Sequence, residues 1–413
     1  MTLPRKHSVV ITRKKQARRT RSAETSKGRA SAARTRKKTV TPRSKRSSGA
    51  TGRRLRAKSA LRSPRVLRRQ RFVTIQRHEA NPIIEPRGEN FWEIKATFNP
   101  AAINVDGRVH LLYRAIGGDD MSTLGYAVSD DGVTIAERPE TFAFEHRNQG
   151  AGPLTTVPKI NYLSGGGCAG GSEDPRLVLM ENDRVYLTYT AFDGWGSVRI
   201  ALSSIAKDDF INRRWQWSRP IFLSPPGEVH KNWVLFPEKI NGKFAILHSI
   251  SPEVLVDYVD DLSEFEDDEK NIKSSYSRFS NVDEWDSWVR GAGPPPLRTR
   301  LGWLLFYHAM DARDPNRYKL GAMILDAHDP TKIVYRSRVP VLAPEEWYEN
   351  TGWKSGVIYS CGAVVKDGEL YVYYGGADSV VCVAMADLDH FLEEIVRYGT
   401  PRLTKKEGVK VKK

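Results

Sequence analysis

Two adjacent carboxylates, Glu173 and Asp174, stand where an apolar strand begins in the stretch GGCAGGSEDPRLVLM, residues 166–180. Acidic residues are poor strand formers and lose solvation when they are buried, so their place needs an explanation. One explanation is chemical, because a carboxyl group at the mouth of a pocket can transfer a proton to a substrate. The other is structural: the pair caps the turn or forms an ion pair with Arg176.

Basic side chains stand at comparable places elsewhere in the chain. Arg114 and His308 lie near the ends of apolar runs, and Lys231 precedes another run. Like charges repel, so several cationic groups that converge on one mouth indicate an anionic ligand such as phosphate or a carboxylate. Aromatic residues with polar neighbours, including Trp353 and Tyr359, are typical of sugar binding, although many will only pack the core.

Other kinds of site are not indicated. The glycine-rich stretch before Glu173 lacks the Gly-Lys-Ser/Thr ending of a phosphate-binding loop and leads into a strand, where such a loop needs a helix. The sequence has no serine nucleophile elbow and no metal-binding histidine pair. We therefore predict no metal site.

One pattern occurs five times after residue 72. Each copy places a turn dipeptide before a β-rich apolar run, and the second residues of the copies are 76, 59, 60 and 66 residues apart. Such dipeptides between apolar runs predict β-hairpins. The copies are DGRVHLLYRA, NDRVYLTYTA, NGKFAILHSI, LGWLLFYHAM and DGELYVYYGG.

Repeated antiparallel units without intervening helices predict an all-β fold, a five-bladed β-propeller over residues 72–400. Tandem β-sandwiches are the alternative. In a propeller the first strand of every blade lines the central channel, so the residues that open these strands converge at one end of the axis. We expect these residues to be Asn99, Asp174, Phe236, Gly293 and Gly362.

The charge of the chain is concentrated in its termini. Residues 1–71 hold 26 lysine and arginine residues and a single acid, Glu24, whereas the whole chain has a net charge of +16. With no aromatic residue before Phe72 and no apolar period, this basic tail is predicted to be disordered. It could contact nucleic acid or another polyanion, serve as a targeting segment, or be only a solvated extension. A second basic tail covers residues 401–413.

Composition also bears on location. The chain has three cysteines without metal-ligand spacing, which favours a reducing compartment and argues against a disulfide framework. No apolar run approaches the length of a membrane span. We therefore expect a soluble cytoplasmic protein with no membrane contact; its oligomeric state is left open, and a homo-oligomer is compatible with the sequence.

At these residues the chain resembles glycoside hydrolase family 130, the mannoside phosphorylases and related β-mannosidases, which are five-bladed β-propellers. The resemblance covers most of residues 75–395. It rests on the stretches NPAAINVDGRVHLLYRA, GSEDPRLVLM, HKNWVLFPEKINGKFAILH, WVRGAGPPPLRT, GWLLFYHAMD and YSCGAVVKDGELYVYYGGADS.

The resemblance implies inverting phosphorolysis of a β-linked manno-oligosaccharide to α-mannose 1-phosphate, with inorganic phosphate as co-substrate and no cofactor. Asp174 matches the family's general acid, which acts through the 3-hydroxyl of the mannose. The implied phosphate ligands are Arg114, Lys231 and His308, with Lys239 less certain, and the implied substrate ligands are Asn99, Glu173, Arg176, Tyr359 and Asp378. A further arginine that many members carry after the Arg114 position is absent, and Arg290 or Arg298 could replace it.

Two other functions stay open. A β-mannosidase would use water in place of phosphate and would need a second carboxylate, for which Glu173, Asp286 and Asp378 are candidates. A non-catalytic glycan- or nucleic-acid-binding propeller would need neither Asp174 nor the cationic groups. Because the sequence retains both, we favour the phosphorylase.

Overall fold

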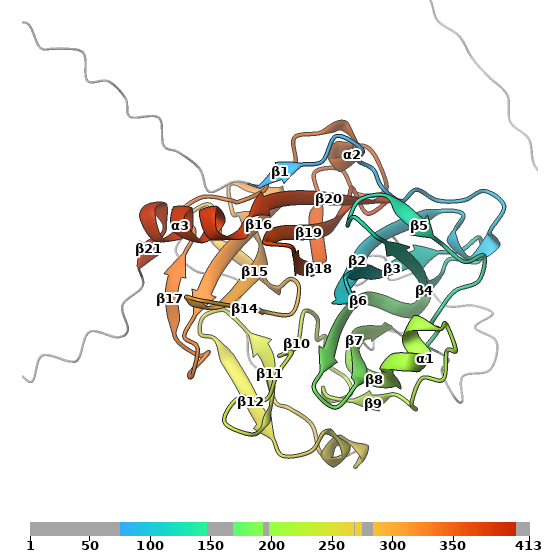
Figure 1. Cartoon of the computed structure of the whole chain (residues 1–413), viewed down its shortest axis with the longest axis horizontal. Coiled ribbons are helices and arrows are strands. Elements are labelled where there is room, and N and C mark those ends of the chain that lie inside the picture. The colour runs from blue at the N-terminus through green and yellow to red at the C-terminus, as the bar shows by residue number, and fades with distance from the viewer. Residues whose placement is uncertain (1–74, 147–167, 193–197, 268, 275–283, 402–413) are drawn as a thin grey trace, which may run out of the picture. The chain divides into compact units, whose positions relative to one another are not determined.

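The computed structural model describes residues 75–146, 168–192, 198–267, 269–274 and 284–401. These residues fold mainly into β-strands, with few helices (Figure 1). The basic tails predicted at the two termini lie outside the described residues, apart from Pro401. No helix in the described part of the chain is both long enough and apolar enough to cross a membrane.

The strands form five antiparallel groups, which we call units 1 to 5 in chain order. Unit 1 contains β2 (Ala96–Val105), β3 (Arg108–Ile116), β4 (Met121–Ser129) and β5 (Ile135–Glu137). Unit 2 contains β6 (Gly170–Met180), β7 (Arg184–Phe192), β8 (Val198–Ala206) and β9 (Ile221–Phe222). Unit 3 contains β10 (Val234–Leu235), β11 (Phe244–Ser249) and β12 (Leu255–Val259). Units 1 and 2 share a sheet, because β4 and β6 pair in parallel over two residues.

The last two units also recruit the ends of the described chain. Unit 4 contains β13 (Trp288–Ala292), β14 (Leu297–Thr299), β15 (Gly302–Asp311), β16 (Asp314–Leu325), β17 (Ile333–Arg336) and β21 (Thr400–Pro401). Unit 5 contains β18 (Ile358–Lys366), β19 (Glu369–Gly376), β20 (Val380–Asp387) and β1 (Gln76–Arg77). The helical segments are η1 (Phe91–Glu93), α1 (Lys207–Ile211), η3 (Leu262–Glu266), α2 (Trp347–Asn350) and α3 (Leu388–Tyr398).

The five predicted hairpins are confirmed. Each turn dipeptide joins two antiparallel strands: β2 to β3, β6 to β7, β10 to β11, β14 to β15 and β18 to β19. Three of the turns, Asp106–Gly107, Asn241–Gly242 and Asp367–Gly368, have positive φ at both residues. Positive φ at both residues is the geometry of a type I′ turn, which explains the choice of Asp-Gly and Asn-Gly there.

The hydrophobic core consists of clusters that each lie between two units. Units 1 and 2 share a cluster, and so do units 2 and 3, 3 and 4, 4 and 5, and 5 and 1. The alternating apolar residues of each sheet therefore face two neighbours, one on each side. Representative pairs in that order are Leu112 with Leu187, Leu202 with Ile246, Leu247 with Leu305, Phe306 with Val372, and Val383 with Leu111.

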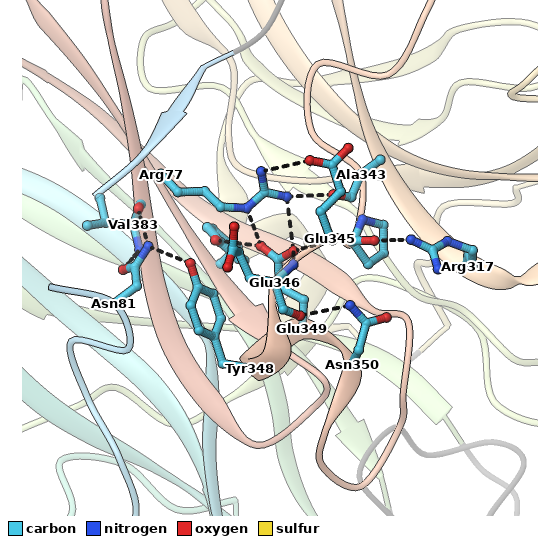
Figure 2. Close-up of polar contacts among 12 residues, drawn as sticks. Arg77, Asn81, Arg317, Ala343, Glu345, Glu346, Tyr348, Glu349, Asn350 and Val383 are labelled. Carbon is cyan, nitrogen blue, oxygen red and sulfur yellow. Dashed lines mark hydrogen bonds and ion pairs between the residues drawn. The ribbon is translucent and has the colours of Figure 1, made fainter. Parts of the chain in front are cut away.

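A polar clasp, formed by Arg77, Asn81 and Glu349, fastens the first described residues to unit 5 (Figure 2). The Arg77 guanidinium donates from Nε to Glu349 Oε1 at 2.7 Å and from a terminal nitrogen to Oε2 at 2.9 Å. Glu349 is fully buried and also accepts from the Tyr374 hydroxyl at 2.8 Å. Asn81 exchanges two hydrogen bonds with the backbone of Val383. The clasp therefore joins residues more than 260 positions apart in the chain.

Replacing Arg77 by methionine is expected to lower the free energy of unfolding by about 3 kcal/mol, because the buried Glu349 carboxyl loses its cation. Urea unfolding measures the change. Arg300→Met is the matched control, since Arg300 pairs with Asp389 at 2.9 Å where both side chains are at least half exposed, and it should lose less than about 1 kcal/mol. Equal losses in the two variants would show that the clasp adds nothing beyond a surface ion pair.

Candidate active site

The site is built on irregularities in the first strands of units 1, 2, 4 and 5. The pairing of β2 with β3 shifts between Phe98 and Ala101, and that of β6 with β7 shifts between Glu173 and Arg176. Comparable shifts interrupt β13 and β18. Such bulges redirect side chains, and at two of them Asn99 and Asp174 adopt positive φ, which asparagine and aspartate tolerate better than most residues.

The bulges bring Asn99 and Asp174 into contact. The Asn99 side-chain nitrogen donates to Asp174 Oδ1 at 2.8 Å, and Arg114 donates to the same oxygen at 3.1 Å. Gly375 packs against Asn99 so closely that a Cβ atom there would lie 2.2 Å from Asn99 Oδ1. The fifth unit therefore holds the amide of the first unit against the acid of the second.

Glu173 lies beside Asp174 and has its own partners. Its Oε1 is 3.2 Å from an Arg114 nitrogen and accepts from the Cys168 thiol at 3.1 Å. Its Oε2 accepts from the Lys231 ammonium at 2.8 Å. Arg114 also donates to the Ser122 hydroxyl at 3.0 Å. The adjacent carboxylates Glu173 and Asp174 are thus buried beside two cations, Arg114 and Lys231.

These cations set the charge of both acids. Burial by itself would raise the pKa of Asp174 and of Glu173, but the charges of Arg114 and Lys231 outweigh burial and hold both pKa values below their ordinary range. In turn, Glu173 and Asp174 raise the pKa of Lys231 in spite of its desolvation. All four groups are therefore charged at neutral pH.

Arg176, which was expected to be a substrate ligand, connects three of the units through its hydrogen bonds. It is fully buried and donates to the carbonyl oxygens of Asp174 at 2.7 Å and Gly293 at 3.0 Å. A third bond, at 2.9 Å, goes to the side-chain oxygen of Asn232, which precedes β10. These bonds connect unit 2 with units 3 and 4, so Arg176 positions the backbone of Asp174.

His308 is neutral, which corrects the expectation that it belongs to a cationic cage. It is completely buried and stacks on Tyr359 with 3.9 Å between ring centroids. Burial first, and then the nearby charge of Arg176, lower its pKa to about 3. Its Nε2 accepts from the backbone N–H of Ser360 at 2.9 Å, so the proton of the neutral ring is on Nδ1.

Two buried polar atoms of the site have no partner in the described part of the chain. They are Asn99 Oδ1, an acceptor, and His308 Nδ1, a donor. Both lie near Asp174, since Asn99 bonds to it and its charge acts on the pKa of His308. Buried polar atoms are usually paired, so an unpaired acceptor and an unpaired donor near one acid indicate the place of a polar ligand.

Tyr359 and Asp378 complete the cluster. The Tyr359 hydroxyl donates to the side-chain oxygen of Asn232. Asp378 is buried in the turn between β19 and β20, adopts positive φ, and contributes to the raised pKa of Arg114. The neighbouring Ser379 carbonyl accepts from the backbone of Thr97, two residues before Asn99. Both predicted residues therefore lie with the acid.

Lys239 does not reach the site. It is exposed in the turn between β10 and β11, where its ammonium lies 4.4 Å from the centroid of the Phe244 ring. Arg298 is also remote, since it pairs loosely with Glu238 and stacks on Trp303. Arg290 is closer: its guanidinium lies 5.3 Å from the Trp288 ring, and its charge contributes to the lowered pKa of His308.

The predicted convergence is wrong for unit 3. Phe236 is fully buried in the cluster between units 3 and 4, whereas the Gly293 carbonyl accepts from Arg176, which also bonds to the Asp174 carbonyl. In unit 3, Asn232 and not Phe236 bonds to Arg176. Asn232 and Gly291 both have positive φ, and a Cβ atom on Gly291 would lie 2.7 Å from that of Asn232. Sequence reasoning missed Asn232 and Cys168, although Asn232 directly follows Lys231 and Cys168 interrupts the glycine run before Glu173.

The donors of this site suit a sugar and an anion. Across the described ranges, no group of three or more His, Cys, Asp or Glu side chains is arranged to hold a metal ion. The chemistry that the arrangement can perform is proton transfer by a buried carboxyl beside a cation, Lys231, whose side chain is 22% exposed.

Comparison with known proteins gives consistent matches. Residues 74–397 match the family model of glycoside hydrolase family 130, described as beta-1,4-mannooligosaccharide phosphorylase. A 1,2-beta-oligomannan phosphorylase of a Thermoanaerobacter species is 37% identical over 77% of this chain and 98% of its own length. A beta-1,2-mannobiose phosphorylase of the same organism is 34% identical over 74% and 95%.

A solved structure shares the fold. The β-1,2-mannobiose phosphorylase of Listeria innocua, in complex with β-1,2-mannobiose, aligns with a TM-score of 0.60 over 78% of this chain and 99% of that chain. Its sequence identity to this chain is 23%.

Proposed function

The chain belongs to glycoside hydrolase family 130, and we propose that it catalyses the reversible, inverting phosphorolysis of β-mannosides to α-mannose 1-phosphate. It is thus a glycosyl-transferring enzyme that uses inorganic phosphate. The observation that carries the proposal is the buried Asp174, which is held by Asn99 and Arg114 next to an accessible Lys231 and two unpaired polar atoms.

We assign the architecture to a five-bladed β-propeller, in which units 1 to 5 are the blades and residues 72–400 are the catalytic domain. The hydrophobic clusters between consecutive units, including units 5 and 1, support it. We retain as predictions the basic tails at residues 1–71 and 401–413, contact with polyanions, a homo-oligomeric state and a cytoplasmic location. Cys168, Cys361 and Cys382 are buried and form no disulfide, which is compatible with a reducing compartment.

In the proposed reaction, a phosphate oxygen forms a bond to the anomeric carbon while the bond from that carbon to the leaving oxygen breaks. Asp174 supplies the proton for the leaving oxygen through the 3-hydroxyl of the mannose. Because Asp174 is ionised beside Lys231, it must first take up a proton, from solvent or from the incoming hydrogen phosphate, before it can act as an acid. A phosphate dianion on Lys231 would neutralise that cation and so raise the pKa of Asp174.

Lys231 and Arg290 are the cations best placed to meet phosphate, with His308 Nδ1–H as a neutral donor. Arg114 is fully buried and bonded to both acids, so its main role is to hold the carboxylates. We assign the binding of the mannose hydroxyls to Asn99, Glu173, Tyr359 and Asp378. The relatives at 37% and 34% identity favour a β-1,2 linkage over β-1,4.

The test of the reaction is incubation with β-1,2- and β-1,4-mannobiose, with and without phosphate, followed by detection of mannose 1-phosphate. We expect the sugar phosphate only when phosphate is present.

Release of mannose at the same rate without phosphate would instead support a β-mannosidase. That alternative is weaker, because Asp286, one candidate for its second carboxylate, bonds to Tyr307 and Arg336, and Glu173 bonds to Lys231.

Replacing Lys231 by alanine is expected to weaken phosphorolysis by about 2–4 kcal/mol of transition-state stabilisation, because the charge next to the nucleophile is lost. Steady-state kinetics with phosphate and mannoside varied separately should show a raised KM for phosphate or a lowered kcat, with a smaller change in the KM for mannoside. Lys239→Ala is the matched control and should behave as the wild type. A loss confined to the KM for mannoside would argue against a phosphate site at Lys231.

A further inference from the structure

The loop between α2 and β18 carries an exposed tryptophan at the edge of the site. Trp353 donates its backbone N–H to the Ser379 hydroxyl at 2.9 Å, and Lys354 donates its backbone N–H to the Ala377 carbonyl at 3.0 Å. These two bonds attach the loop to both neighbours of Asp378. Trp353 is therefore fixed next to a residue assigned to the mannose site.

The indole is held in one orientation while much of it faces solvent. Its Nε1–H donates to the Lys95 carbonyl at 3.2 Å, yet Trp353 is 56% exposed. The next residue, Lys354, lies over the Tyr318 ring at 4.4 Å, and the Tyr318 ring is 6.2 Å from that of Tyr359. The loop thus extends from the unit 1 side of the site to its unit 4 side.

An exposed aromatic ring that is already fixed loses little conformational freedom when a ligand stacks on it. The residues that would meet the reacting mannose, Asn99 and Asp174, are almost completely buried. When the first mannosyl residue is enclosed there, only later sugars of the oligosaccharide can reach an aromatic ring at the surface. The exposed face of Trp353 therefore suits a sugar beyond the first two.

We propose that Trp353 is a stacking site for the third mannosyl unit of an oligomannoside, and that it makes the enzyme prefer chains of three or more units over mannobiose. This inference rests on the proposed phosphorolysis. It names the chain length of the substrate, which the β-linkage alone leaves undetermined.

The test compares kcat/KM for β-1,2-mannobiose and β-1,2-mannotriose in Trp353→Ala. Loss of one sugar-stacking contact should lower the value for mannotriose about five- to tenfold and change that for mannobiose less than about twofold. Trp353→Phe should keep most of the mannotriose activity. Trp347→Ala is the matched control, because Trp347 is 62% exposed and packs on Tyr348 within α2, before the loop that carries Trp353.

Equal losses on both substrates, or no loss on either, would overturn the proposal. The first outcome would mean that Trp353 only supports the loop, and the second would leave the ring for another partner, such as a second protein. If the wild type formed no mannose 1-phosphate at all, the proposed function would fail. The stacking site would still be tested then, by the affinities of the wild type and Trp353→Ala for mannotriose in isothermal titration calorimetry.

Discussion

Turnover of a β-mannoside with phosphate is expected to fall at least about a hundredfold when Asp174 is replaced by asparagine, because the variant has no acidic proton to donate. The fold should persist. An asparagine can still accept from Asn99 and Arg114, and it tolerates the positive φ of 48° at this position. Initial rates of mannose 1-phosphate formation and the thermal midpoint measure the two effects.

Asp106→Asn is the matched control. Asp106 also adopts positive φ, at 51°, but it lies in the hairpin turn between β2 and β3, where Lys207 is its partner. The turnover of the Asp106→Asn variant should stay at the wild-type value. An aryl β-mannoside whose leaving group needs no protonation should recover much of the rate in Asp174→Asn, as expected for a lost acid. Near-normal turnover of the natural mannoside in folded Asp174→Asn would remove Asp174 from that role.

Replacing Arg114 by alanine is expected to lower the free energy of unfolding by about 3–5 kcal/mol at neutral pH, because two buried carboxylates lose their shared cation. The loss should shrink as the pH falls. In the wild type the pKa values of Glu173 and Asp174 are lowered, so the stability they contribute is present above about pH 4.5 and declines on acidification. In the variant the buried acids lack this cation, bind protons more readily when folded, and so favour folding as the pH falls.

Urea unfolding of the wild type and the variant at several pH values measures this difference. Arg114→Lys keeps the positive charge but not the planar guanidinium that bonds to both carboxylates, and it should lose less stability than Arg114→Ala. If Arg114→Ala does not fold, the lysine variant still tests the ion pairs through the same pH dependence. A loss below about 1 kcal/mol at neutral pH, unchanged by acidification, would mean that the ion pairs of Arg114 do not support the fold.

The sequence by itself determined the local structure of this protein. Turn dipeptides such as Asp106–Gly107 and Asn241–Gly242 fix hairpins, because only a few residues tolerate positive φ at two consecutive positions. The number of such hairpins in the sequence then gives the five units. The same reasoning placed Asp174 at the opening of an inner strand. It placed Arg114 and Lys231 near it, because the end of one hairpin strand and the start of another unit's first strand are expected at the same end of the hairpins.

The charge states and partners of the site depended on the tertiary structure. Arg114 and Asp174 are 60 residues apart in the sequence, and Lys231 and Glu173 are 58 apart, so no local pattern shows that they pair. His308 is neutral because the fold removes it from water beside Arg176, and a sequence position carries no measure of burial.

Tertiary structure also decided which residues reach the site at all. Phe236 and Lys239 stand near a strand opening in the sequence, yet Phe236 packs into the core and Lys239 lies on the surface. Asn232 takes the inner place. No local pattern indicated the clasp between Arg77 and Glu349 either, because the two residues are 272 positions apart in the sequence. Turns and strand alternation are set by neighbours in sequence, whereas burial, ion pairing and protonation are set by neighbours in space.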